Sequence, residues 1–583
     1  MFVSAIEIWN FRSFKHLALN GLPPAVVILG ENNTGKSNLL QALRLVLDPA
    51  MSDRQRQLGY EDFWSGCDQP LSGDEIRVEI HLQGFDTDQR VKAALRDSLV
   101  VDDPLTAKLT YVFRPVPGGG VGAHDEYAAL VFGGNDEANE LTASRRREIA
   151  LTVLPALRDA EADLQHPYRS PLRDLLRMAE VDEDALDEVA AAITTANARL
   201  LQEAPVRGLE SALAAQVKTM VGDTHSVDIG LGVSSPLPEE VLRAVRVLVE
   251  GGFPVSRTGL GAANVLYLAL LLERSRLQRE KDRLAGAILG VEEPEAHLHP
   301  HVQRVLFAYL LQTTSVIVTT HSAQIASVTK LPALVLLQRV QVAGVDETRA
   351  RRAIAKEMTA QQRDDLERYL DVNRADILFA QGVILVEGAA EEYLVAAATR
   401  ESGDLDLHGI TVCSVDGTDF KPYRLLLSAL ALPHVVVTDG DPDEDGKLAG
   451  LKRGVRLLDG EIAEEAVRIR DEEGADELQA YLAEQAIFVS DSTLEVEYAK
   501  TAPDALNAAY RDLVRSPVRR SATAEAVDAA GNGDREADKK LVRRIEAVGK
   551  GRFAQRAAAH LEDAAHPSYL KDAIESLRSQ LTG

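Results

Sequence analysis

The sequence has very few cysteines, because Cys67 and Cys413 are the only two among 583 residues. They lie far apart along the chain, so they predict neither a disulfide framework nor a zinc site built from four thiolates. Such sparse use of cysteine is typical of a reducing compartment, and we therefore expect a cytoplasmic protein.

Long hydrophobic runs are also missing. The apolar stretches are short and interrupted by charged residues, so the sequence predicts no transmembrane segment and no membrane partner. The first residues, MFVSAIEIWNFRSF, are typical of a strand and a turn and lack the basic start and long apolar stretch of a signal peptide. Because 45% of the residues are hydrophobic, we expect a globular chain, and its length predicts about three to four domains.

Positive charge is scarce, since 64 lysines and arginines stand against 90 aspartates and glutamates and the net charge is −26. Domains that bind nucleic acid are usually basic. The overall charge therefore argues mildly against contact with DNA, unless local basic patches or metal ions supply the positive charge.

Strand and helix patterns alternate along most of the chain. Period-two alternation predicts a strand over 74–84, and a charged helical pattern covers 141–222. We interpret this helical region as an insertion that is either a partner surface or a plain subdomain. A second α/β series begins near Ala380, and the polar stretch 521–540 predicts a flexible loop. Solenoid repeats are not apparent.

The segment ILGENNTGKSNLL fits the phosphate-binding pattern G-x-x-x-x-G-K-[ST], with Gly30, Gly35, Lys36 and Ser37 at its fixed positions and Asn33 inside the loop. It follows the apolar run AVVIL and opens a helical pattern, which is the context that this motif requires. Backbone N–H groups of such a loop surround phosphates. We expect Lys36 to reach the β- and γ-phosphates of ATP and Ser37 to bind Mg²⁺.

A second apolar run, AILGVEE, supplies the carboxylates that an ATP site needs. Glu292 is expected to help hold the Mg²⁺, and Glu293 to polarise the attacking water. The run VIVTTHS then ends at a histidine, His321, which we expect to sense the γ-phosphate. These residues lie far beyond Lys36 in the sequence, which suits an ATPase head divided by an insertion.

Two other interpretations of this region have less support. GLGAAN partly matches a dinucleotide fingerprint through Gly259 and Gly261, but Asn264 stands where the third glycine belongs. The segment HLHPH, at 297–301, offers three histidines for zinc, yet no second ligand pair has metal-like spacing. Ordinary turn and helix-start histidines are therefore favoured.

Together these segments resemble the ABC-type ATPases of the SMC-like class. The matching segments are GENNTGKSNLLQAL, GLGAANVLYLALLLE, EEPEAHLHPH and TTHS. In such ATPases the signature segment of one subunit covers the nucleotide of another. The resemblance therefore implies that Gly259 and Gly261 contact ATP across a homodimer or a higher oligomer, although this signature reads SRTGLGAAN where transporters have LSGGQ.

The segment HVVVTDGDPDEDG places five carboxylates directly after an apolar run, at positions 439, 441 and 443–445. Packed carboxylates repel and raise one another's pKa values unless a cation lies between them. A calcium loop is not supported, because its twelfth position, counted from Asp441, is Lys452 and not glutamate. On this stretch alone, a solvated turn and a metal site both stay open.

A second strand end favours the metal site. The run VILVEG ends at Glu387, and Glu391 follows one helical turn later. In a doubly wound parallel sheet the carboxyl ends of the strands meet in one crevice, so Glu387, Asp439 and Asp441 could share one or two Mg²⁺ or Mn²⁺ ions. Two such ions clamp the attacking and leaving oxygens of a phosphodiester.

This pattern resembles the Toprim domain of topoisomerases, primases and OLD (overcoming lysogenisation defect) nucleases. The order of an SMC-like ATPase followed by Toprim resembles the OLD family over nearly the whole chain. The resemblance implies a further metal ligand in STLEVEYA, at Glu495 with Glu497 as its competitor. It also implies that Lys550, in VGKGRFAQRAA, stabilises charge on the phosphate as a catalytic residue beside Glu387.

The resemblance implies an α/β fold in which an ABC-type P-loop head with a helical insertion precedes a Rossmann-like Toprim domain. We expect four segments: the N-terminal part of the head at 1–140, the insertion used for dimerisation at 141–225, the rest of the head with its connector at 226–375, and the Toprim nuclease domain at 376–583.

The function implied is an ATP-dependent, metal-dependent DNA endonuclease. Such proteins are similar to anti-phage defence nucleases, including those of the Gabija type, which work with a UvrD-like helicase. Whether ATP drives, licenses or restrains cleavage stays open, as does the DNA specificity. The alternative is an SMC-like ATPase that senses or tethers nucleic acid and keeps Toprim as a scaffold. A topoisomerase would need a DNA-breaking tyrosine domain, and a primase usually carries a zinc module.

Overall fold

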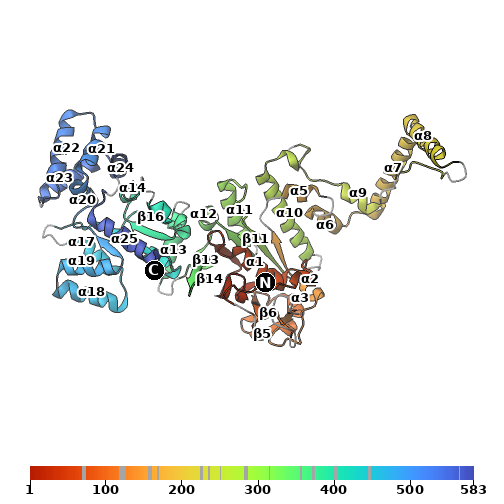
Figure 1. Ribbon diagram of the computed structural model, residues 1–583, viewed down its shortest axis with the longest axis horizontal. Helices are drawn as coiled ribbons and strands as arrows, with labels where there is room; N and C mark the ends of the chain where they lie inside the picture. The colour runs from red at the N-terminus through yellow and green to blue at the C-terminus, as the bar shows by residue number, and fades with distance from the viewer. Residues whose placement is uncertain are drawn as a thin grey trace.

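The structure is a computed structural model of the chain. It describes residues 1–67, 74–116, 127–154, 160–166, 170–222, 227–233, 237–249, 251–280, 286–313, 315–354, 358–370, 374–397, 404–443, 448–532, 534–562 and 565–582. Figure 1 shows a head that contains the N-terminus, a helical arm that extends from it, and a C-terminal α/β region on the side away from the arm.

The head contains an antiparallel sheet in which β4 is central. Its strands are β2 (Phe14–Asn20), β1 (Phe2–Phe11), β4 (Ile76–Gln83), β6 (Leu105–Pro115) and β5 (Leu99–Asp102) in spatial order, with β7 (Tyr127–Gly133) also paired to β6. β4, which the alternation of IRVEIHLQ predicts, alternates buried and half-buried residues along its length. One face of this sheet therefore covers an apolar core.

The second sheet of the head carries the expected nucleotide segments. Its spatial order is β14 (Val345–Arg352), β13 (Leu334–Val342), β3 (Ala25–Leu29), β12 (Val316–Thr320), β11 (Gly286–Glu292) and β8 (Ile149–Leu154). All neighbours are parallel except β13 and β14. Apolar residues of α1 (Lys36–Leu47) share one core with both sheets, which fixes the helix that follows the P-loop.

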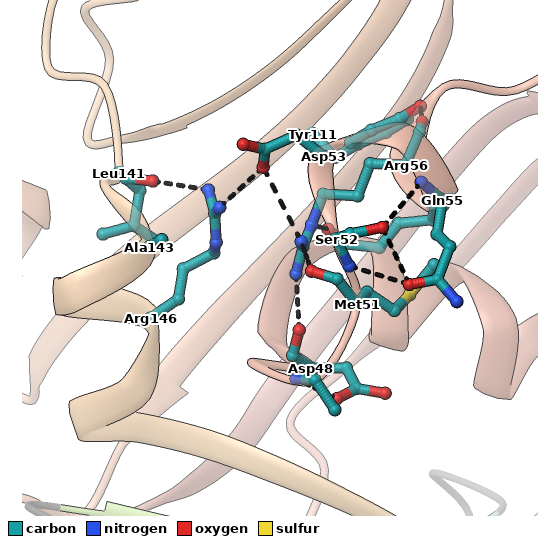
Figure 2. Close-up of polar contacts among 12 residues, drawn as sticks. Asp48, Met51, Ser52, Asp53, Gln55, Arg56, Tyr111, Leu141, Ala143 and Arg146 are labelled. Carbon is teal, nitrogen blue, oxygen red and sulfur yellow. Dashed lines mark hydrogen bonds and ion pairs between the residues drawn. The ribbon is translucent and has the colours of Figure 1, made fainter. Parts of the chain in front are cut away.

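Two buried arginines secure the segment that follows α1 (Figure 2). Arg56 ends α2 (Asp53–Arg56) and donates to the main-chain oxygens of Leu45, Met51 and Asp48. Arg146 lies on α4 (Ala143–Glu148) and donates to the carboxylate of Asp53 at 3.0 Å. These bonds satisfy buried polar groups and tie the start of the predicted insertion to the head.

One part of the predicted helical insertion is wrong. Residues 149–154, IALTVL, form strand β8, which pairs in parallel with β11. A short apolar run cannot be distinguished from a buried helix by its periodicity, and the free edge of β11 decides the outcome. The described helices of 141–222 are α4, α5 (Ala160–Gln165), α6 (Pro171–Met178), α7 (Glu183–Leu201) and α8 (Ala204–Val221).

The arm is the hairpin of α7 and α8, which extends away from the head (Figure 1). No residue of α8 is buried in the single chain. Exposed apolar side chains lie along both helices, among them Leu200, Leu209 and Met220. After α9 (Pro238–Ala244) and the small β9–β10 pair (Leu248–Val249, Phe253–Pro254), the chain returns to the head through α10 (Leu260–Glu280).

The C-terminal region is built on a fully parallel sheet of four strands. Their spatial order is β16 (Ile410–Ser414), β15 (Gly382–Val386), β17 (His434–Thr438) and β18 (Ile487–Val489). The two strands that end at the predicted carboxylates, β15 and β17, are neighbours. Every residue of β15 is buried, as the continuous apolar run GVILV predicts.

Helices cover this sheet and form a C-terminal cluster beside it (Figure 1). They are α14 (Ala389–Ala397), α15 (Asp404–Leu407), α16 (Lys421–Ala429), α17 (Ala449–Arg456), α18 (Gly460–Glu472), α19 (Ala475–Glu484), α20 (Leu494–Thr501), α21 (Pro503–Leu513), α22 (Pro517–Ala529), α23 (Arg535–Glu546), α24 (Lys550–Ala558) and α25 (Ser568–Thr582). The remaining helices of the head are α3 (Gln89–Ala94), α11 (Pro300–Thr313) and α12 (Ala323–Ala326), with 3₁₀ turns at Tyr60–Asp62, Arg96–Ser98, Val255–Arg257 and Leu331–Ala333.

The flexible loop predicted at 521–540 is also wrong, because α22 and α23 occupy most of it. Ala537, Leu541 and Ile545 are buried four residues apart, so α23 has a helical apolar stripe. The Asp534 side chain caps its first turn by accepting from the N–H groups of Glu536 and Ala537. Polar composition concealed this periodicity.

The head and the C-terminal region share one apolar core. It passes from β3 through α13 (Ala360–Tyr369) and the 3₁₀ turn Arg374–Phe379 to Val383 and Leu385 of β15. At this junction Gln381 Nε2 donates to Glu31 Oε1 of the P-loop at 2.6 Å. A cavity of about 400 Å³ lies beside the contact and is lined by both residues. None of the helices in the described part of the chain is long and apolar enough to cross a membrane.

Candidate active sites

The P-loop lies between β3 and α1 and needs glycine at two positions. Gly35 has a φ of +92°, and a Cβ there would lie 2.5 Å from Ser13 Oγ. A Cβ on Gly30 would lie 2.8 Å from the main-chain oxygen of Leu337. Asn33, inside the loop, has a φ of +66°, which asparagine tolerates better than most residues. The two glycines of the motif are therefore required by the backbone conformation and the close contacts of the loop.

All three N–H donors of Lys36 have contacts, two inside the P-loop and one at His321 after β12. Its Nζ donates to the main-chain oxygens of Gly30 at 3.0 Å and Glu31 at 2.9 Å, and lies 2.6 Å from His321 Nε2. Burial lowers the pKa of Lys36, and nearby carboxylates, first that of Glu293, counter the shift. Burial and the Lys36 charge lower the pKa of His321, so the neutral ring can accept a hydrogen bond from Lys36 at Nε2. ATP phosphates would replace these acceptors.

The carboxylates of the second strand surround the same point. Ser37 Oγ donates to Glu292 Oε1, so the two predicted Mg²⁺ ligands of the ATP site touch. Glu293 Oε1 lies 3.4 Å from His321 Nε2. The structure thus brings together Lys36, Ser37, Glu292, Glu293 and His321 from three neighbouring strands.

Glu295 is a site residue that the sequence reasoning missed. It accepts from the main-chain N–H of His321 and from Thr320 Oγ1, both at 2.7 Å, and so holds the histidine loop in place. Its signal was present, because Glu295 is the third carboxylate of the EEPEAH segment.

We expect Glu295→Ala to lower ATP turnover by about tenfold to a hundredfold, because it removes two hydrogen bonds that position His321. The ATP concentration at half-saturation should change little, since both hydrogen bonds of Glu295 go to Thr320 and His321 and neither goes to the P-loop. Steady-state ATPase assays measure both quantities. Glu295→Gln, which keeps one carbonyl acceptor, should lose less, and equal turnover of Glu295→Ala and the wild type would contradict this role.

The predicted signature segment does not join this cluster. A Cβ on Gly261 would lie 2.5 Å from the main-chain oxygen of His297, and Asn264 Nδ2 donates to the main-chain oxygen of Ala296 at 3.1 Å. In the part of the chain that the structure describes, no hydrogen bond or ion pair links Gly259 or Gly261 to the P-loop. Their contact with ATP of another subunit stays a prediction.

The zinc interpretation of 297–301 gains no support. His299 and His301 stack on each other with ring centroids 5.4 Å apart, and Arg304 Nη2 lies 2.6 Å from His301 Nδ1. Across the residues described, no three histidine, cysteine, aspartate or glutamate side chains are arranged as a preformed metal site.

The carboxyl ends of β15 and β17 form the second site. Glu387 follows β15, and its Oε1 accepts from the main-chain N–H of Asp439 at 2.9 Å and from Thr438 Oγ1. Asp439 follows β17, and its Oδ1 accepts from the main-chain N–H of Leu494 at 3.0 Å. Adjacent parallel strands therefore place two predicted metal ligands side by side.

Arg453 of α17 lies between the carboxylates and was missed by the sequence reasoning. Its guanidinium donates to Glu387 Oε1 at 3.0 Å, to Asp441 Oδ2 at 2.9 Å and to the main-chain oxygen of Asp439. Glu387 and Asp441 are thus separated by a single guanidinium group. No motif marks this arginine, because only the packing of α17 brings it there.

The remaining carboxylates are buried close to one another. Burial, followed by repulsion from Glu391, Glu387 and Glu495, raises the pKa of Asp439 well above its ordinary value. Burial and the charges of Glu387 and Glu495 raise the pKa of Glu391 to about 7. Glu495 is 5% exposed, and its Oε2 has no hydrogen-bond partner. These groups form one negatively charged cluster at the ends of β15 and β17, called the carboxylate pocket below.

The oxygen donors of this set are of the kind that a divalent cation prefers, but their side chains are not arranged as a preformed site. The ligands are carboxylates, which Mg²⁺ and Mn²⁺ prefer, and the unpartnered oxygen of Glu495 is available to one. Arg453 holds one oxygen of Glu387 and one of Asp441, while the hydrogen bond from Gly388 N–H at 3.1 Å holds Glu391 Oε2. The side chains therefore surround one site without converging on a single point.

Lys550 and the pair Glu495/Glu497 can now be placed. Lys550 Nζ lies 3.4 Å from Glu495 Oε1. Burial opposes its charge, but attraction to Glu495 and Asp439 outweighs burial and raises the pKa of Lys550. Glu497 instead forms an ion pair with Lys500 at 2.8 Å. The structure therefore brings Glu495 to the pocket and turns Glu497 away. Of the acidic run, 444 and 445 lie outside the described residues.

Comparison with known proteins finds both of the predicted domains. Residues 378–441 match the family described as "Overcoming lysogenization defect protein-like, TOPRIM domain", and residues 1–110 and 177–326 match "AAA ATPase domain". The OLD nuclease of Thermus scotoductus is 25% identical over 532 residues, which cover 84% of this chain and 90% of that protein.

Two further relatives are similar. Endonuclease GajA of Bacillus cereus is 22% identical over 489 residues, 79% of this chain and 80% of that protein. The solved C-terminal region of the Burkholderia pseudomallei OLD protein is 36% identical, covers 35% of this chain and 99% of that one, and has a TM-score of 0.29. The family matches confirm the predicted combination of an ATPase head with a C-terminal Toprim domain of the OLD-like type.

Proposed function

We propose that this protein is an ATP-binding, metal-dependent DNA endonuclease whose Toprim site is controlled by its ATPase head. The observation that carries the proposal is the buried carboxylate pocket with Lys550 at its rim, at the carboxyl ends of two adjacent parallel strands. The names of the relatives, OLD nuclease and endonuclease GajA, support the same reaction class.

The Toprim site would hold Mg²⁺ or Mn²⁺ through Glu387, Glu391, Asp439, Asp441 and Glu495. When bound, the metal activates water and neutralises charge on a phosphodiester. Around it, the side chains of this chain have separate tasks. Lys550, which stays protonated because of its acidic neighbours, stabilises negative charge on the scissile phosphate.

Arg453 holds two of these carboxylates in position. It binds one oxygen each of Glu387 and Asp441 and leaves their other oxygens available to the metal. This arrangement keeps the negative pocket folded before a cation arrives.

In the head, Lys36 and the main-chain N–H groups of the loop would bind the ATP phosphates, and Ser37 with Glu292 would hold the Mg²⁺ of the nucleotide. Glu293 would polarise the attacking water, and His321 would contact the γ-phosphate. Displacement of Lys36 from His321 by the nucleotide changes the same loop that touches Gln381.

The arm formed by α7 and α8 is the proposed dimerisation element. Its apolar side chains are exposed in the single chain. The resemblance to ABC-type ATPases further implies that the signature segment contacts the nucleotide of a second subunit. We further propose, from the family resemblance, a role in defence against phage and a UvrD-like helicase as partner.

Nicking of supercoiled plasmid tests the proposed function. Purified protein is expected to cut only with Mg²⁺ or Mn²⁺, with Lys36→Ala altering the response to ATP by removing phosphate binding. Gel analysis of the cut plasmid, with and without ATP, distinguishes the effect of the ATP site from that of the nuclease site. If the wild type hydrolyses ATP and leaves DNA uncut under every metal condition, the protein is the ATP-dependent sensor or tether and not a nuclease.

A further inference from the structure

The C-terminal helices concentrate positive charge in an otherwise acidic chain. Residues 511–556 contain twelve lysines and arginines against seven aspartates and glutamates, whereas the whole chain has a net charge of −26. These residues run from the end of α21 through most of α24, in the cluster of helices at one end of the C-terminal region (Figure 1). The scarcity of basic residues overall therefore does not apply to this cluster of helices.

One face of α23 carries a row of exposed cations. Arg535, Lys539 and Arg543 are spaced four residues apart, while the apolar stripe of the helix packs into the core. A helix rises about 1.5 Å per residue, so successive cations are about 6 Å apart along the axis. This spacing resembles that of phosphates along a nucleic-acid strand.

This row faces the carboxylate site across a cavity. The cavity has a volume of about 670 Å³, and Arg535, Lys539 and Arg543 line it together with Asp441 and Thr493. Arg535 Nη1 also donates to the main-chain oxygen of Asp443 at 3.1 Å, which fixes the start of α23 beside the acidic loop. The basic face thus leads toward the predicted metal ligands.

Five acidic residues also line the cavity: Asp441, Asp443, Glu536, Asp538 and Glu546. Two of them, Glu536 and Asp538, lie beside Lys539 on α23. Glu536 lies 3.6 Å from Lys539 Nζ, but both are exposed, and such pairs are worth little. Asp538 Oδ1 accepts from the main-chain N–H of Gly531 at 2.8 Å and so serves the turn before α23. A phosphate could therefore replace Glu536 at Lys539 at small cost.

We propose that the Arg535–Lys539–Arg543 face binds the sugar–phosphate backbone of a DNA duplex and directs one strand to the carboxylate pocket. The inference rests on the proposed function and names the path of its substrate. Contacts to phosphates position a duplex without reading its sequence, so this face would contribute affinity and not base specificity.

The test compares two double variants that each remove two positive charges. Lys539→Ala/Arg543→Ala changes the proposed face. Arg519→Ala/Lys540→Ala is the matched control, because neither side chain lines the cavity beside Asp441; both line a second cavity between α22 and α23, which Arg543 also borders. Fluorescence anisotropy of a labelled duplex is measured with the full chain in EDTA, where no cleavage occurs, over a series of salt concentrations.

The first variant should raise the Kd about tenfold and reduce the slope of log K against log salt by about 2, since each lost phosphate contact removes about 0.9. The control should stay within about twofold of the wild type. In cleavage assays with Mg²⁺, the first variant should show a KM raised about tenfold and an unchanged kcat, because neither residue belongs to the carboxylate pocket. Unchanged ATP turnover confirms that both variants fold.

Three outcomes would overturn the inference. Equal weakening by both double variants would show a diffuse charge effect. Wild-type affinity in the first variant, with the wild type cutting plasmid, would refute the α23 path and leave the nuclease function intact. A wild type that neither binds nor cuts DNA would remove the proposed function itself.

Discussion

Asp439→Asn is expected to abolish metal-dependent cleavage and, at the same time, to stabilise the metal-free protein. Asp439 is buried among Glu391, Glu387 and Glu495, and this crowding raises its pKa. Losing a central metal ligand should slow cleavage by about a thousandfold or more. Removing one buried like charge should raise the free energy of unfolding in EDTA by about 1 to 3 kcal/mol.

The stability should also depend on pH in a defined direction. The folded-state pKa of Glu391 is raised from 4.5 to about 7, so the folded state binds this proton more tightly than the unfolded state. The resulting stability is complete below pH 4.5 and is lost as the pH rises through about 7. The pKa of Asp439 is raised as well, so its contribution is lost in the same direction.

Thermal unfolding in EDTA, between about pH 5 and 8, measures these effects. Added Mg²⁺ or Mn²⁺ should stabilise the wild type by binding the folded state and should leave Asp439→Asn unchanged. Asp512→Asn is the control, because that carboxylate lies on the surface, bonded to His560 at 2.8 Å. If metal stabilised the wild type and Asp439→Asn equally, these carboxylates would not share a cation.

Lys550→Met is expected to slow DNA cleavage by about a hundredfold to a thousandfold without loss of metal binding. The Nζ group lies 3.4 Å from Glu495 Oε1 and carries a charge that its acidic neighbours stabilise. Removing one preorganised group that stabilises transition-state charge has an effect of this size. The rate is measured under single-turnover conditions with saturating Mg²⁺.

A second lysine–glutamate pair, on α20 next to Glu495, provides the control. Lys500 pairs with Glu497 at 2.8 Å, two residues beyond Glu495 on α20, and should tolerate Lys500→Met with less than about twofold change. The metal-induced shift in unfolding temperature should persist in Lys550→Met. If both methionine variants cut DNA at the same rate, Lys550 has no special part in the reaction.

Much of each site could be predicted, because the residues belong to strand ends. A P-loop has fixed spacing and needs a strand before it and a helix after it, so Lys36 and Ser37 follow from the letters alone. The proximity of Glu387 and Asp439 follows from another rule, since parallel strands gather their carboxyl ends at one edge. Neither inference needs side-chain packing.

The residues that were missed are set by tertiary contacts. Arg453 reaches Glu387 only because α17 packs beside β17, and nothing in AGLKRGVR marks that contact. The choice between Glu495 and Glu497 has a geometric cause: residues two apart point to opposite sides of a helix. The strand at 149–154 and helix α23 were misjudged because short apolar runs and polar composition are ambiguous locally.

Strand β15 connects the two sites, because the residue before it contacts the P-loop and the residue after it belongs to the carboxylate pocket. Gln381, just before it, bonds to Glu31 of the P-loop, and Glu387, just after it, belongs to the nuclease pocket. Five strand residues span about 17 Å, and this strand is held between β16 and β17. Because the strand is paired on both sides, we expect a shift of the P-loop that moves Gln381 to move Glu387 as well. Metal ligation tolerates errors of only about 0.5 Å, so even a small shift of this kind should change metal binding at the carboxylate pocket.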